Sequence, residues 1–504
     1  MGIFDNYKLN KEITTKDFYF GSPEAEGENV TGSSLIDYFE DYLGVIRELE
    51  RNHFIFIGRK GVGKSAIAKF IKDTSDKTDD SHAAIVRIGD YNKERIIQSN
   101  NSIEISGNLV FEWLILINIV KLIVKSECGK YTEEFNKLRK FLERNTGSVE
   151  IDKFETTEIF IKNGGEINFE VLRHVFNGIF KNYFDTKTTR APFYKLINPL
   201  KEIVRTILSF DALKNDEYWL LFDDLDINYD INSVENNDNV IELLRIARNY
   251  NNELLNVSKA KILVFLREDM YNVLVSRYSD SAKLFNSYCI PINWYNHMSS
   301  TTDENTMPLK RMINKRIEIN FKNHNIEYDI EDPWTSLVKD NHRVYGKSSF
   351  KYILDYTFYR PRDIITFLTV LSRDAYKYPV DDASVKVILK NYINTNILEI
   401  KSELSIFFNE EEKDYLFTHV FKYVASNNNI TYDDMNKYVS EFKFNLDSEK
   451  VLDILIEYNL LIYKDISGRL IINYREDNIG IYDKDNLYLC LHKCLYHYYK
   501  TIYY

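Results

Sequence analysis

The sequence predicts an α/β protein in which helices cover both faces of a parallel β-sheet. Two observations lead to this prediction. Short apolar runs with the look of buried strands alternate with segments of helical periodicity, and strands buried on both faces form continuous apolar runs. The predicted strands are 53–57, 83–88, 218–222, 261–266 and 288–292.

The composition limits the classes of protein to consider. The chain has 504 residues, of which 44% are hydrophobic and 28% charged, so it is long enough for two to four domains and is not a disordered chain. A net charge of -11 disfavours a protein that coats nucleic acid. The 4 cysteines do not suggest a secreted disulfide framework. We see no signal peptide or membrane span, and we expect a cytoplasmic protein without a membrane partner.

The spacing of the predicted strands divides the chain. Residues 1–50 form an N-terminal leader, helical over 34–50, which we expect to pack on the next domain. The α/β core spans 51–293. The gap between its second and third strands is too long for an ordinary crossover, so it predicts a helical insertion at about 106–208. Helical patterns then dominate 294–402, which we interpret as a helical lid domain.

The pattern of residues 403–504 is three helices followed by a short hairpin, which predicts a winged-helix domain. The third helix, 448–459, carries several acidic residues. Such a surface is unsuited to phosphates, which favours packing or protein interaction over DNA binding. The C-terminal helix carries Cys490, Cys494 and His497 on one face, where zinc is an alternative to simple packing.

A glycine-rich loop follows the first strand and precedes a helix. Its residues are Gly58, Arg59, Lys60, Gly61, Val62, Gly63, Lys64 and Ser65, and the helix continues from Ala66. Glycines let main-chain amides curl around an anion, and the helix N-terminus is positive. The spacing predicts a P-loop that binds ATP through all of these residues. Lys64 would neutralise the β- and γ-phosphates, and the Ser65 hydroxyl would ligate Mg²⁺.

An acidic cluster follows the third predicted strand, at the sheet edge where ligands bind. Asp223 would hold Mg²⁺ through water, and Asp224 would orient or activate the attacking water. Asp226 would be a helper or only a helix cap. The alternative is an acidic turn after a strand. Asp224 is shorter than the glutamate common at such positions, which predicts slow hydrolysis.

Three arginines are candidates for contact with the phosphates. Arg267 ends the fourth strand, where it would sense the γ-phosphate, unless it is a solvated strand end. Arg360 and Arg362 flank Pro361 at the start of a helix. Either one would reach the phosphates from a second domain and couple closure to nucleotide state. The alternative is a helix start with surface arginines.

These motifs together resemble the AAA-related and STAND-like P-loop ATPases of bacteria. They are most similar to the Sll1717-like family, itself similar to Orc/Cdc6-type ATPases. Besides the loop, the resemblance rests on Phe20, Gly21, Glu24, Glu26, Asp223, Asp224, Leu225, Asp226, Leu266, Arg267, Glu268, Asp269, Ile292, Asn293, Trp294, Arg316, Ile317, Arg360, Pro361, Arg362 and Asp363. It implies an ATPase core, a helical lid and a C-terminal winged helix. It also implies a nucleotide switch, and several relatives belong to antiviral defence systems.

Three functional hypotheses follow. The first is a slow, Mg²⁺-dependent ATPase that acts as a switch, through nucleotide-dependent self-association or binding of a partner effector protein. The second is a DNA-engaging ATPase of the Orc/Cdc6 kind, which the acidic balance disfavours. The third is an ATP-binding scaffold that does not hydrolyse.

Overall fold

The chain divides into two compact units. The computed structural model describes residues 12–24, 27, 35–87, 107–126, 132–146, 166–213, 215–226, 229–231, 233–295, 303–472, 474 and 487–503. By their contacts, Gly44–Arg59 and Lys64–Ile292 form one unit, which we call the sheet unit. Met1–Leu43, Lys60–Gly63 and Asn293–Tyr504 form the other, the helical unit. Glu26 and Cys128 lie outside the described residues.

The sheet unit is built on a five-stranded parallel sheet, as the sequence predicts. Its strands are β1 (Ile55–Gly58), β2 (Ser81–Arg87), β5 (Glu217–Asp223), β6 (Lys259–Arg267) and β7 (Cys289–Pro291). Their order is β2-β5-β6-β1-β7, and all pairings are parallel. Strand β6 therefore lies between β1 and β5. Because the strands run in parallel, the residues that end them share one edge of the sheet.

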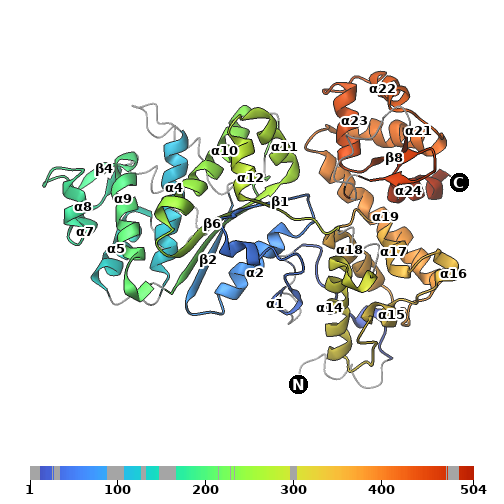
Figure 1. The fold of residues 1–504 in the computed structure, drawn as a ribbon, viewed down its shortest axis with the longest axis horizontal. Helices are drawn as coiled ribbons and strands as arrows, with labels where there is room; N and C mark the ends of the chain where they lie inside the picture. The colour runs from blue at the N-terminus through green and yellow to red at the C-terminus, as the bar shows by residue number, and fades with distance from the viewer. Residues whose placement is uncertain are drawn as a thin grey trace. The chain divides into compact units, whose positions relative to one another are not determined.

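Helices lie on both sides of this sheet. Figure 1 shows α2 (Lys64–Ser75) on one side of the strands and α10 (Val234–Asn249) and α11 (Glu268–Arg277) on the other. Helix α12 (Ser281–Tyr288) precedes β7, and the π-helical turn η7 (Tyr250–Leu254) follows α10. Each helix turns a buried apolar face inward, which accounts for the continuous apolar runs of the strands.

The long segment between β2 and β5 is mostly helical where it is described. Its helices are α4 (Gly107–Val124), α5 (Glu133–Thr146), α7 (Glu170–Arg173), α8 (Asn177–Lys181), α9 (Phe193–Leu208) and the 3-10 turn η6 (Asp211–Leu213). The strands β3 (Glu166–Asn168) and β4 (Arg190–Pro192) pair in an antiparallel hairpin. Helix α4 is buried, as its apolar sequence predicts. Among the described helices, none combines the length and apolar character needed to cross a bilayer.

The predicted helix over residues 34–50 is wrong. The structure has a short helix α1 (Leu35–Tyr38) and a 3-10 turn η4 (Arg47–Glu50), separated by turns. Gly44 between them has a φ of 68°, a left-handed conformation that ends helical continuity. The apolar spacing of this segment reflects burial of several short pieces and not one helical face.

Residues 12–20 contact the C-terminal half of the chain, whereas we expected the leader on the α/β core. The 3-10 turn η2 (Thr15–Asp17) begins at Thr15, whose amide donates to the Tyr376 carbonyl at 3.0 Å. The Tyr19 amide donates to Asn320 Oδ1 at 2.8 Å. The Phe18 ring packs edge-on against Phe321. All these residues belong to the helical unit.

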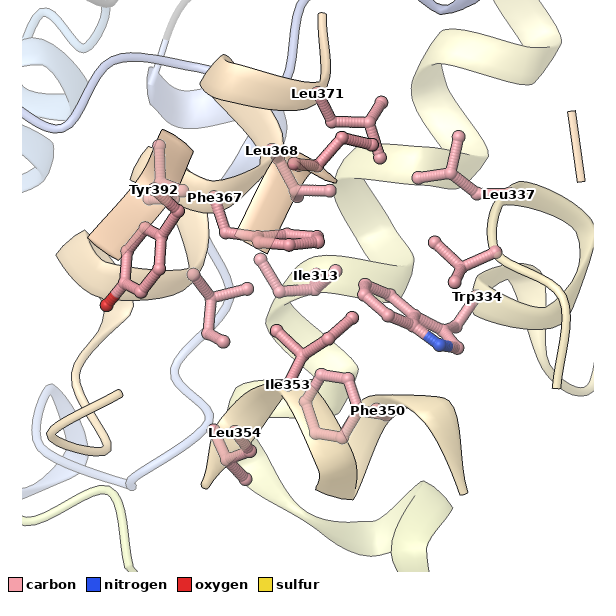
Figure 2. Close-up of a cluster of buried hydrophobic side chains, with 14 of the residues drawn as sticks. Ile313, Trp334, Leu337, Phe350, Ile353, Leu354, Phe367, Leu368, Leu371 and Tyr392 are labelled. Atoms are coloured by element: carbon pink, nitrogen blue, oxygen red, sulfur yellow. The ribbon is translucent and has the colours of Figure 1, made fainter. Parts of the chain in front are cut away.

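The helical unit has its own apolar core. Its helices are η8 (Glu304–Thr306), α14 (Pro308–Asn323), α15 (Pro333–Leu337), α16 (His342–Tyr345), α17 (Ser349–Leu354), α18 (Pro361–Leu371) and α19 (Asp382–Leu404). Figure 2 shows the Trp334 indole beside Phe350 in this core, with Ile313 and Phe367 next to them. The Trp334 indole nitrogen donates to Ser349 Oγ at 3.0 Å, which satisfies its buried N–H.

A smaller three-stranded antiparallel sheet lies in the last hundred residues. Helices α20 (Glu410–Tyr415), η9 (Leu416–Val420), α21 (Phe421–Ser426), α22 (Tyr432–Ser440) and α23 (Ser448–Glu457) precede it. Strands β8 (Leu461–Asp465), β9 (Leu470–Ile471) and β10 (Leu487–Leu491) pair in the order β10-β8-β9, and α24 (Lys493–Tyr503) follows. The hairpin of β8 and β9 is predicted by the sequence, but β10 is not.

The arrangement behind the zinc alternative is wrong. Cys490 lies in β10, whereas Cys494 and His497 lie in α24, so the three do not share one helical face. Cys494 is fully buried in the core, where its sulfur accepts a hydrogen bond from the Asn396 side chain at 3.6 Å. Among the described residues, no group of three or more His, Cys, Asp or Glu side chains is placed to hold a metal ion.

Candidate functional site

The glycine-rich loop connects β1 to α2, the context that its sequence predicts. Gly58 is the last residue of β1, and Lys64, Ser65 and Ala66 open α2. Gly61 and Gly63 have φ values of 82° and 99°, which L-residues with side chains rarely adopt. The two glycines are therefore required by the backbone of this loop.

The Lys64 ammonium folds back over the start of the loop. Its Nζ donates to the carbonyl of Gly58 at 2.9 Å and to that of Arg59 at 3.1 Å. Burial lowers the pKa of Lys64 to about 8, and the charge of Arg267 adds to this, while Asp223 opposes it. The surroundings of Lys64 therefore disfavour its positive charge. A bound anion would favour that charge and raise the pKa again.

Asp223 ends β5 beside the start of α2. It is only 5% exposed, and it hydrogen-bonds with the Ser65 side chain. Burial first, and then the charge of Asp224, raise the pKa of Asp223 to about 6, whereas the Ser65 hydrogen bond and Lys64 oppose the rise. A hydroxyl and a carboxylate in contact are hard oxygen ligands of the type that Mg²⁺ prefers. The donor set of Ser65 and Asp223 fits this metal.

Asp224 is paired with an arginine that the sequence analysis missed. Its carboxylate lies 3.0 Å from Nε of Arg87, the last residue of β2, and its backbone has a φ of 52°. Arg87 and Asp223 are partners in the register of β2 and β5. The sequence could have indicated Arg87, because a charged residue that ends a buried strand lies at the same sheet edge as the ends of the other strands.

Arg267 is buried among carboxylates, so the alternative of a solvated strand end is wrong. Only 6% of the residue is exposed. Its guanidinium binds Asp226 at 2.7 Å and Asp269 at 2.5 and 3.2 Å. Burial acts to raise the pKa of Asp226, but Arg267 holds that pKa below its usual value. Asp226 is thus a partner of the candidate sensor, a role that its place after the strand did not reveal.

Arg360 is also buried, so the alternative of a surface arginine is wrong for this residue. It is 2% exposed and occupies the position just before the first residue of α18. Its guanidinium forms a two-pronged ion pair with Asp363, at 2.9 and 3.1 Å, and a second pair with Glu403 at 2.6 Å. The same group donates to the Lys60 carbonyl at 3.1 Å. The Arg360 side chain therefore contacts the main chain of the loop.

Arg362 contacts the loop through its own backbone. Its amide donates to the Gly61 carbonyl at 3.3 Å, while its side chain reaches the Pro23 carbonyl at 3.2 Å and Glu399 at 3.5 Å. A Cβ on Gly61 would lie 3.1 Å from the Arg362 Cβ. The side-chain partners of Arg362 in the helical unit are thus a carbonyl and a carboxylate.

The structure brings the predicted residues together in two groups. Within the sheet unit, Lys64, Ser65, Asp223 and Arg267 interact with one another at the ends of β1, β5 and β6. Within the helical unit, Lys60–Gly63 lies against the start of α18. The first group concentrates charge of both signs at the start of α2 and the ends of the neighbouring strands, an arrangement suited to hold an anion and a divalent cation.

Part of the helical unit is similar to a known protein family. Residues 307–397 match a family model described as the FunZ-associated C-terminal helical domain. The match begins beside α14 and ends within α19, so it covers the helices of the core in Figure 2. No curated protein matches the chain. The chain is therefore a mixed α/β protein with a five-stranded parallel sheet and a C-terminal helical domain similar to that family.

Proposed function

We propose that this chain is a P-loop ATPase: it binds ATP with Mg²⁺ and hydrolyses it slowly, as a molecular switch. The observation that carries the proposal is the group formed by Lys64, Ser65 and Asp223. Lys64 closes over the loop carbonyls, and Ser65 contacts a buried carboxylate at the carboxyl edge of a parallel sheet. A loop that binds phosphates and a carboxylate that binds Mg²⁺ must meet in this way.

Each residue has a defined part in the proposed reaction. The amides of the loop and Lys64 would bind the β- and γ-phosphates, with the α2 N-terminus adding its positive end. Ser65 and Asp223 would hold Mg²⁺, whose charge stabilises the transferred phosphoryl group. Asp224 would accept the proton of the attacking water. Arg267, buried close enough to Lys64 to lower its pKa, would respond to the γ-phosphate by exchanging carboxylate partners.

The proposal is tested by binding and turnover in matched variants. We expect Lys64→Ala to lose most affinity for Mg·ATP, because the ammonium that meets the phosphates is removed. Lys72→Ala is the control, since Lys72 lies on the same helix and pairs on the surface with Asp76. Isothermal titration measures affinity, and phosphate release measures turnover. Equal ATP binding by the wild type and Lys64→Ala would remove the proposal.

A second candidate is an ATP-binding scaffold without hydrolysis. It is favoured by the ion pair between Asp224 and Arg87, because Asp224, the candidate base, is already bound to a cation. The two candidates differ in the effect of Arg87→Gln. If Asp224 is a base restrained by Arg87, this variant should change the rate of phosphate release, and Asp224→Asn should abolish it. A scaffold would retain ATP and release no phosphate in any of the three proteins.

We further propose a winged-helix domain at 403–504 and a role in bacterial antiviral defence. The order of helices α21, α22 and α23 before β8 and β9 supports the first. The resemblance to Sll1717-like ATPases supports the second, and the matched helical domain is described as FunZ-associated. We expect the switch to act through self-association or a partner effector protein. Phage challenge of cells that carry the wild type or Lys64→Ala tests the biological role.

A further inference from the structure

Three successive carbonyls of the loop, at residues 60–62, accept hydrogen bonds from other residues of the same helical unit. The Lys60 carbonyl accepts from the Arg360 guanidinium at 3.1 Å. The Gly61 carbonyl accepts from the Arg362 amide at 3.3 Å. The Val62 carbonyl accepts from the Trp294 indole N–H at 2.8 Å. The loop side chain of Lys60 adds a hydrogen bond to Ser402 Oγ at 3.4 Å.

These three bonds fix the direction of three amides. A peptide group is planar and trans, so the carbonyl of one residue and the N–H of the next point in opposite directions. Bonds to the carbonyls of residues 60, 61 and 62 therefore turn the N–H groups of Gly61, Val62 and Gly63 away from the helical unit's donors. Consecutive amides that point to one side form an anion-binding concavity.

The donors are themselves held firmly. Asp363 and Glu403 fix the Arg360 guanidinium from two sides, and Asp363 also accepts from the Phe358 amide at 2.8 Å. The Arg362 amide belongs to the first turn of α18, where N–H groups lack a partner inside the helix. Here that amide has the Gly61 carbonyl as its acceptor. The Arg360 guanidinium and the Arg362 amide thus have a defined direction before any ligand arrives.

We propose that Trp294, Arg360 and the Arg362 amide are positioning groups that pre-orient the phosphate-binding amides of the loop. This inference rests on the proposed binding of a nucleotide phosphate by that loop. The groups act through the loop backbone, and they touch no phosphate themselves. These three groups thereby set the affinity of the loop for the diphosphate portion of a nucleotide, in contrast to a role in which an arginine side chain binds phosphate directly.

The test variant lacks the N–H donor of Trp294 but keeps an aromatic ring at that position. Trp294→Phe deletes the indole N–H, and the control Trp219→Phe makes the same change at the start of β5, far along the strand from the loop. A single net hydrogen bond corresponds to about a threefold to tenfold change in affinity. We expect Trp294→Phe to weaken binding of both Mg·ADP and pyrophosphate by this factor. Trp219→Phe should leave both affinities unchanged.

A second measurement separates positioning from damage to the fold. The melting temperature of the nucleotide-free protein should fall in Trp294→Phe by no more than the loss of one hydrogen bond predicts, because Trp294 is only partly buried. If this variant does not fold, a benzothienylalanine at position 294 replaces only the N–H by sulfur, and the same loss is expected. Affinities within twofold of the wild type for either ligand would overturn the inference. A wild type that binds neither ligand would instead refute the proposed function together with it.

Discussion

Asp223 and Lys64 lie close together, and each is held in surroundings that oppose its charge. The pKa of the carboxyl is raised to about 6 and that of the ammonium is lowered to about 8, with burial as the largest cause for both. Near neutral pH both groups keep their charges in the absence of ligand. A phosphate and a divalent cation would relieve this cost, because each supplies the opposite charge at short range.

The first prediction concerns the pH dependence of the metal. A raised carboxyl pKa means that the folded, metal-free protein favours the protonated form, and this stabilisation is lost as pH rises through about 6. Mg²⁺ needs the ionised form, so the proton competes with it below that pH. We expect the Mg²⁺ enhancement of ATP affinity to decline as pH falls from 7 to 5. Titration calorimetry measures it, and Asp223→Asn should show no enhancement at either pH.

The second prediction concerns proton uptake by Lys64. Its lowered pKa means that the nucleotide-free protein gains stability as pH rises from about 8 toward the unfolded pKa, where the unfolded chain binds more protons. Phosphate binding favours the ammonium. At pH 8.5, ATP binding should therefore take up about half a proton or more. Calorimetry in two buffers of different ionisation enthalpy detects this, and equal enthalpies in both buffers would contradict it.

The third prediction concerns the backbone of the loop. Gly61→Ala places a Cβ at a φ of 82° and 3.1 Å from the Arg362 Cβ, so it adds strain and a close contact. We expect a loss of about 1–2 kcal/mol in unfolding free energy, together with weaker ADP binding. Gly178→Ala in α8 is the control, because nothing lies within 4 Å of its Cβ position. Chemical denaturation compares the two variants.

At the scale of elements, α18 depends on a buried network at its first turn. Arg360→Met would leave the carboxylates of Asp363 and Glu403 buried without their cation. Removal of one partner from a buried pair costs about 3–5 kcal/mol. We expect this loss in denaturant unfolding, against about 0–1 kcal/mol for Arg362→Met, whose pair with Glu399 is partly exposed. Similar losses in the two variants would show that the network contributes little.

The strands of the parallel sheet could be predicted because each is a continuous apolar run. Strand β10 could not, because its five residues adjoin a helix with similar composition, and a run that short fits either structure. The predicted helix over 34–50 failed at Gly44, whose left-handed backbone no periodicity reveals. The glycine-rich loop between a strand and a helix could be predicted from its spacing. The pairing of Arg360 with Glu403 could not, because Glu403 lies 43 positions away.

On the scale of the whole molecule, each unit has a separate core. Leu263 of β6 and Phe367 of α18 are both fully buried, one in each unit. Truncation of such residues costs about 2–5 kcal/mol. We expect Leu263→Ala and Phe367→Ala to shift different transitions in calorimetry, since chains with several domains rarely unfold in one step. Leu398→Ala, at a side chain that is 70% exposed, should shift neither. A single transition moved equally by both would show that the units unfold together.

The partners of the first described residues have a consequence for how the chain matures. Tyr19 finds its acceptor 301 residues later, and Thr15 finds one 359 residues later, with the entire sheet unit encoded between them. At about 5–20 residues per second, a ribosome needs on the order of 15–70 s to deliver these partners. The aromatic segment around Phe18 and Phe20 therefore lacks its native contacts on the nascent chain for that time. It is therefore a natural place for a chaperone to bind during synthesis.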